Sequence, residues 1–143
     1  MGARQRGRKA LLQARYAELI NGRPMSVNLQ SVQELLEDDE LALGVPLETQ
    51  DWHWVEALAA AVTDNAETID SVITPHLSTW SLDRLDPVTR LILQQAVAEV
   101  NHLVPPTPRA VAIDEAVELA KMFDSDEAAG FVNAVLDSIF REN

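Results

Sequence analysis

Apolar side chains recur at steps of three and four along most of this chain, and this spacing constrains its fold more than any other feature. A half-buried strand would instead alternate at every second residue, and no such alternation is found. The pattern therefore predicts an all-α fold. The clearest case is one long helix over residues 49–73, whose apolar positions are Trp52, Val55, Leu58, Ala59, Val62, Ala66, Ile69 and Ile73.

Punctuation by Pro, Gly and capping residues divides the rest of the chain into further helices. Asn21-Gly22-Arg23-Pro24 predicts the end of a first helix, and Asn28 is a possible cap for a second. Asp86-Pro87 and Thr107-Pro108 each combine a capping residue with proline in the first turn. The helices predicted in addition to 49–73 cover residues 3–21, 29–37, 87–103, about 108–123 and 125–140, with a loop at 37–46, an end or kink at Pro75 and one helical turn within 78–85.

The 143 residues suffice for one domain with a buried core. Six or seven helices with short connections predict a single domain, 1–143, made of two small packed helical subdomains, 1–78 and 79–143. The absence of cysteine excludes disulfides, thiolate nucleophiles and Cys-based zinc sites, and fits a reducing cytoplasm. We expect neither a signal peptide nor a membrane span, because the longest apolar run, Trp54–Val62, is short and contains Glu56.

Charge is distributed very unevenly along the chain. Residues 1–23 hold six basic side chains against the single acid Glu18, whereas the other 120 residues hold five basic and 22 acidic ones. A basic end on an acidic body is typical of localised anion binding, although a solubilising tail would look the same by charge alone. Within the predicted first helix, Arg4, Arg8 and Arg15 are spaced at four and seven, so they share a face.

No arrangement of residues predicts catalysis, a metal or a cofactor. His53, His76 and His102 lack the i, i+4 ligand spacing of a helical metal site, and packing or helix-end positions account for them. Paired acids are expected by chance in so acidic a chain. The glycines form no phosphate-binding loop, and no serine lies in a nucleophile elbow. The sequence therefore predicts a binding protein and not an enzyme.

Three segments resemble one family. RKALLQARYAEL (residues 8–19) is similar to the opening helix of the NusB family, and RLDPVTRLILQQAVAEV (84–100) to its middle helix. AVAIDEAVELAKMFDSDEAAGFVNAVLDSI (110–139) resembles the most specific block of that family, with about a dozen identities in register. Residues 25–50 carry no diagnostic motif.

This resemblance implies two helical subdomains and a role in bacterial transcription antitermination. The implied partners are the ribosomal protein NusE, the boxA element of nascent RNA and the antitermination complex of RNA polymerase, notably on ribosomal RNA operons. The implied RNA-binding residues are Arg4, Arg6, Arg8, Gln13 and Tyr16 in the first helix, with Phe131 stacking a base and Glu127 close to the same surface.

Physical chemistry favours the same residue types, because single-stranded RNA needs cations for its phosphates and flat side chains for its bases. Arg4, Arg8 and Arg15 supply the cations in this reading. Two alternatives stay open. Tyr16 could be a half-buried core ring, and Phe131 could belong to a core stripe with Val135 and Ile139.

The chain departs from the family pattern mainly by losing cations. Gly130 stands where the family has lysine, Gln94 where it has arginine, and Ala110 where it has lysine beside Arg109. Ala98 stands where the family has tyrosine, and together with Gln94 this difference weakens the expected RNA contact of the middle helix. Asp114 and Ala134 also differ. These losses predict that residues 4–16 supply most of the RNA affinity, with the partner supplying the rest.

Three other functions remain open from the sequence. An acidic helical adaptor would bind a basic protein and little RNA, and a homodimer could cover the basic helix. An RNA-binding module like the helical domain fused to certain ribosomal RNA cytosine methyltransferases is disfavoured, because no methyltransferase domain follows residue 143 in this sequence.

Overall fold

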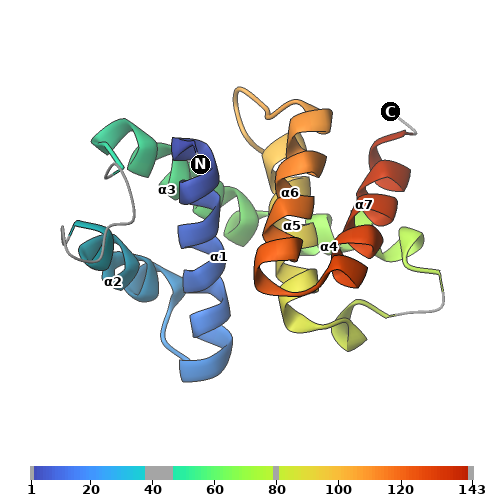
Figure 1. The fold of residues 1–143 in the computed structure, drawn as a ribbon, viewed down its shortest axis with the longest axis horizontal. Coiled ribbons are helices and arrows are strands. Elements are labelled where there is room, and N and C mark those ends of the chain that lie inside the picture. Colours follow the sequence, from blue (N-terminus) through green and yellow to red (C-terminus); the bar gives the residue numbers. More distant parts are fainter. Residues whose placement is uncertain (1, 38–46, 79–80, 142–143) are drawn as a thin grey trace. The chain divides into compact units, whose positions relative to one another are not determined.

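The computed structural model describes residues 2–37, 47–78 and 81–141, and in these ranges it contains helices and no strand (Figure 1). The all-α prediction is confirmed. The loop predicted at 37–46 lies outside the described residues except for Glu37, which ends a helix. None of the described helices is both long and apolar enough to cross a membrane. The α-helices are α1 (Ala3–Asn21), α2 (Met25–Glu37), α3 (Thr49–Asp64), α4 (Ala66–Ile73), α5 (Pro87–Asn101), α6 (Arg109–Phe123) and α7 (Asp126–Arg141), with 3-10 turns η1 (Thr74–His76) and η2 (Leu82–Arg84).

Two compact units divide the chain between Ala57 and Leu58, within α3. The subdomain boundary predicted from the sequence lies later in the chain, after residue 78. The difference arises because α4 packs on α5 and α7, so residues 58–78 belong with the second unit by their contacts.

In the first unit α1 and α2 lie side by side. The chain leaves α1 through Gly22, whose φ of 73° is the left-handed conformation that glycine adopts without strain. Here the predicted stop signal is confirmed. The second helix, however, starts at Met25, so the prediction that Asn28 caps it is wrong. Asn28 is buried inside α2, and its amide donates to the Arg23 carbonyl and bonds with the Asn21 side chain.

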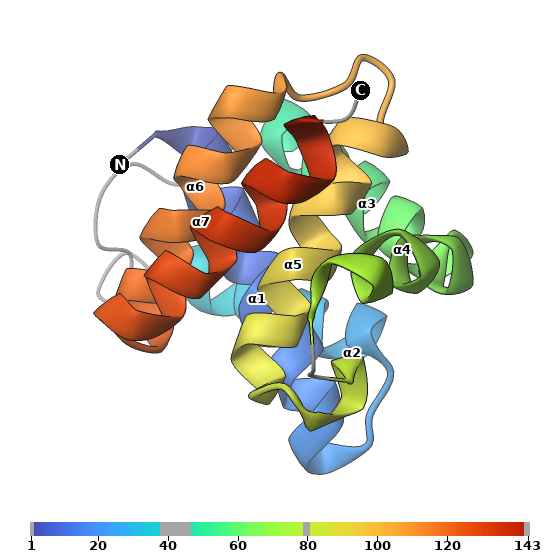
Figure 2. The ribbon, with the colours of Figure 1, turned by 90° about the vertical axis from the view of Figure 1, so that its right-hand side faces the viewer.

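In the second unit α5 is the central helix, and α4, α6 and α7 all pack against it (Figure 2). Its buried apolar residues lie on several faces, as expected for a helix surrounded by others. The predicted inward positions Leu91, Ile92, Ala96 and Val97 are all buried. Leu93 and Ala98 are buried as well.

The long helix predicted over residues 49–73 is two helices, because the chain breaks at Asn65. Asn65 has φ −120° and ψ 22°, outside the helical region, and its amide donates to the Ala61 carbonyl at 2.9 Å. That bond satisfies a carbonyl at the end of α3. Ala66, predicted to point inward, is exposed, while Ile69 and Ile73 are buried as predicted.

Thr107 was predicted to cap the sixth helix, and this prediction is also wrong. Its hydroxyl donates to the buried carboxylate of Glu99 at 2.9 Å, and its amide donates to the Glu99 carbonyl. Thr107 therefore fastens the proline-rich connection to α5, and α6 begins at Arg109 without a side-chain cap.

The cap predicted for α5 is confirmed. The Asp86 carboxylate accepts from the Thr89 amide at 3.4 Å, while the Thr89 hydroxyl donates to Asp124, at the end of α6, at 3.1 Å. The two carboxylates thus meet around one threonine. Hydrogen bonding with Asp86, helped by partial burial, raises the pKa of Asp124 above its ordinary value.

We expect Asp124→Asn to raise the free energy of unfolding at pH 7, since the amide can still accept from Thr89 but no longer repels Asp86. The folded protein binds the Asp124 proton more tightly than the unfolded chain. The stability from this group is therefore present at low pH and lost as pH rises through the raised pKa. Urea unfolding should show a gain at pH 7 that shrinks towards pH 4.

Asp126→Asn is the matched control, because Asp126 lies in the first turn of α7, where a carboxylate stabilises the helix. It should lower stability at pH 7. An equal loss in both variants would contradict the repulsion between Asp86 and Asp124.

Candidate nucleic-acid interface

Positive charge is concentrated at the amino end of α1. Arg4, Arg6, Arg8 and Lys9 lie in its first two turns, the first turn contains no acid, and no side chain caps the helix. The helix macrodipole is itself positive at this end, so these cations destabilise the helix that carries them. Backbone N–H groups and cations pointing the same way form a strong attraction for anions.

Two of these arginines lie over the ring of Trp54, on α3. The guanidinium carbon of Arg4 is 4.6 Å from the ring centroid, and that of Arg8 is 5.1 Å away. Both distances are within the range of cation–π attraction. Arg4 is exposed, whereas Arg8 is only 4% exposed.

Gly7 lets α1 approach α3 closely at this point. A Cβ atom added to Gly7 would lie 2.7 Å from Cγ2 of Val55 and 3.7 Å from ring atoms of Trp54. The first distance is shorter than real Cβ contacts allow, so any larger residue would push the two helices apart. The absence of a side chain at Gly7 therefore allows Val55 and Trp54 to lie close to α1.

The face shared by Arg4, Arg8 and Arg15 is mostly turned away from solvent, since Arg15 is 8% exposed and Arg8 is buried. The more accessible stripe of α1 is Arg6, Lys9, Gln13 and Tyr16, at steps of three, four and three. Gln13 is exposed, Tyr16 is 40% exposed, and Arg6 and Lys9 are half-buried. Lys9 was missed by the sequence analysis, although its spacing to Gln13 and Tyr16 was the signal that could have found it.

The remaining candidates lie on α7, in the other unit. Glu127 is exposed in the first turn of the helix, and Phe131, one turn later, is half-buried. Val135 and Ile139 continue the stripe of Phe131 and are buried, so Phe131 is the accessible end of that stripe. The α1 and α7 residues belong to different units.

At three positions this chain has an uncharged residue where the family has lysine or arginine, namely Gln94, Ala110 and Gly130. Gln94 donates to the Asp70 carboxylate at 2.9 Å, joining α5 to α4. Ala110 is exposed, and Arg109 donates to the Phe140 carbonyl at 3.2 Å. Gly130 is exposed within α7, with nothing within 4 Å of an added Cβ.

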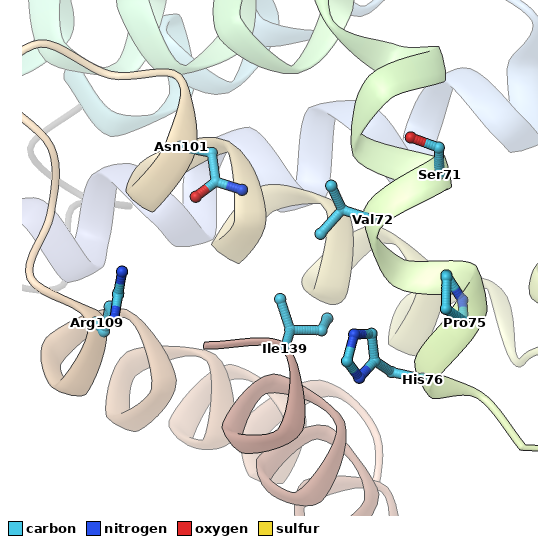
Figure 3. A pocket seen from close by; sticks show the side chains of 7 residues that line it. All are labelled: Ser71, Val72, Pro75, His76, Asn101, Arg109 and Ile139. Carbon is cyan, nitrogen blue, oxygen red and sulfur yellow. The ribbon is translucent and has the colours of Figure 1, made fainter. Parts of the chain in front are cut away.

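A cleft of about 570 Å³ opens in the second unit (Figure 3). Nδ1 of His76 lies 2.8 Å from the Ser138 hydroxyl, but the residues that line the cleft include no carboxylate to complete a catalytic triad. None of the predicted RNA-binding residues lines it. The lining residues are Ser71, Val72, Pro75, His76, Asn101, Arg109 and Ile139. Elsewhere, in the described ranges, no three His or acidic side chains come together as a metal site would require.

An all-helical fold with an uncapped, cationic first helix defines a class of small helical proteins suited to a polyanion. The NusB family model matches residues 5–141. NusB of T. maritima is 27% identical, with 98% of this chain and 92% of that chain covered and a TM-score of 0.81. NusB of Aquifex aeolicus is 26% identical, with 99% and 89% covered and a TM-score of 0.72.

A structure of the antitermination factors NusB and NusE in complex with dsRNA also matches. It shares 24% identity, 100% of this chain and 99% of that chain are covered, and the TM-score is 0.81, which shows the likeness in fold. The protein belongs to the NusB family. The family resemblance stated from the sequence is confirmed.

Substitutions of Gly7 and Gly130, both within helices, test the close packing of α1 on α3, because only Gly7 is crowded. Gly7→Ala should lower the free energy of unfolding by about 1–3 kcal/mol through overpacking against Val55. Gly130→Ala should raise it by up to about 1 kcal/mol, because alanine favours the helix and the surrounding space is open. Chemical denaturation measures both, and a gain in Gly7→Ala would contradict the tight contact.

Proposed function

We propose that this protein is a transcription antitermination factor that binds boxA-type single-stranded RNA together with the ribosomal protein NusE. In this role it acts on RNA polymerase in the bacterial cytoplasm during transcription of ribosomal RNA operons, without catalysing a reaction. Membership of the NusB family supports the antitermination role. A NusB relative in complex with NusE and dsRNA supports an assembly of this composition.

The observation that carries the proposal is the cationic amino end of α1. Four cations within two turns, with no acid and an unfavourable helix dipole, cost the free protein stability. Such a cost is recovered when a polyanion binds. Arg4 and Arg6 would contact phosphates, Gln13 would hydrogen-bond, and Tyr16 would stack on a base. Arg8, buried against Trp54, would act mainly through the position of its neighbours.

The acidic second unit supports the proposed protein partner. Residues 58–143 contain fourteen acidic and five basic side chains, which repel RNA but attract a basic protein. In the proposed complex, α1 holds RNA while acidic surface holds NusE. The same charge favours a second candidate function, an acidic adaptor that binds NusE and has little RNA affinity of its own.

The proposal is tested by titrating labelled boxA-type RNA with the protein at about 50 and about 200 mM salt, with and without NusE. Affinity should fall steeply with salt, and NusE should raise it. The double variant Arg4→Ala/Tyr16→Ala should bind at least about tenfold more weakly, from the loss of one phosphate contact and one stacked base.

Arg84→Ala removes an equal charge from an exposed site outside the proposed interface and serves as the control. A duplex of the same sequence shows whether single strands are preferred. NusE binding without any RNA binding at low salt would reject the proposal in favour of the adaptor.

Gly130→Lys tests whether α7 belongs to the RNA surface. The site is open, so a lysine fits, and it should raise RNA affinity several-fold and steepen the salt dependence by about 0.7 per added phosphate contact. Gly130→Ala is the control for the gain in helix stability. Equal affinities of the two variants would remove α7, and with it Glu127 and Phe131, from the proposed interface.

A further inference from the structure

We infer that Trp54 is a positioning residue of the RNA site, on whose ring Arg4 and Arg8 are stacked before RNA arrives. The inference rests on the RNA-binding function proposed above and deepens it. Trp54 lies about fifty residues away in sequence from the arginines, in a segment without family motifs, and was not among the predicted site residues.

The need for such a residue follows from the arginines themselves. Arg4 and Arg8 are one helical turn apart, and like charges at this spacing repel and destabilise a helix. The electron-rich face of an indole attracts both, with centroid distances of 4.6 and 5.1 Å. Trp54 therefore offsets a repulsion that the free helix would otherwise relieve by moving the side chains apart.

The stack also fixes side chains that would lose freedom on binding. A free arginine loses rotamer entropy when RNA immobilises it, and this loss weakens binding. The contact with the ring holds the exposed Arg4 guanidinium in place, where it is accessible to a phosphate, while the buried Arg8 packs on the same ring and fixes its position. Part of the ordering is thus complete in the free protein, because Gly7 lets the ring lie this close to α1.

This role predicts a change in affinity without a change in the number of phosphate contacts. Trp54→Leu should weaken binding of boxA-type RNA about three- to tenfold, because the exposed Arg4 remains but is no longer held in place by the ring. The slope of affinity against salt should stay that of the wild type, whereas Arg4→Ala should lower it by about 0.7. Trp54→Phe, with a weaker π-face, should lie between Trp54→Leu and the wild type.

His53→Ala is the control, since His53 is the exposed neighbour of Trp54 on the same helix. It should leave both affinity and salt slope unchanged. Wild-type affinity in a folded Trp54→Leu variant would overturn the inference. A wild-type protein that binds no RNA would instead overturn the proposed function.

Fluorinated tryptophans introduced at residue 54 separate the π-face from packing, because each added fluorine weakens cation–π attraction with little change in shape. RNA affinity should fall stepwise with fluorination at constant thermal stability. In the free protein, the ring-current shift of the Arg4 Nε–H proton should show the stack directly. Constant affinity across the series, or no ring-current shift of Arg4, would overturn the inference.

Discussion

The close approach of α1 to α3 at Gly7 is the contact on which the candidate site depends. Residue 7 has no side chain, and an added Cβ would lie only 2.7 Å from Val55 and 3.7 Å from the Trp54 ring, so α1 could not pack this closely with a larger residue there. That ring then lies 4.6 and 5.1 Å from the guanidinium carbons of Arg4 and Arg8. The positions of Arg4 and Arg8 thus depend on Trp54, and that of Trp54 depends on Gly7. We expect a change at any of these residues to alter the positions of the cations on α1.

Several charges in this protein lie where they oppose the stability of the fold. Cations gather where the α1 dipole is already positive, and no acid in the first turn offsets them. Acids dominate residues 58–143, and Asp86 and Asp124 are close enough for hydrogen bonding to raise the pKa of Asp124. Charges of opposite sign in separate segments of one chain attract partners of opposite charge, as the proposed complex with RNA and NusE requires.

Most of the fold could be predicted, because helix formation follows apolar spacing and local punctuation, as at Gly22 and Asp86-Pro87. The errors fell on polar residues whose side chains bond elsewhere than in a local cap: Asn28 to Asn21 and Arg23, Asn65 to Ala61, and Thr107 to Glu99. The cationic character of α1 was visible in the sequence, but its accessible face was not. Periodicity groups Arg4, Arg8 and Arg15 without showing that Arg8 and Arg15 are buried, because that depends on residues far away in the chain such as Trp54.

The most direct test of the central claim is an NMR titration of the isotope-labelled protein with boxA-type RNA, observing arginine Nε–H and tryptophan indole N–H signals. Binding through the cationic end of α1 predicts the largest shifts at Arg4 and at the Trp54 indole, because RNA phosphates would contact the stacked guanidinium directly. The Arg84 signal, outside the proposed interface, should move little. Saturable RNA binding that leaves Arg4 and Trp54 unshifted would contradict the account.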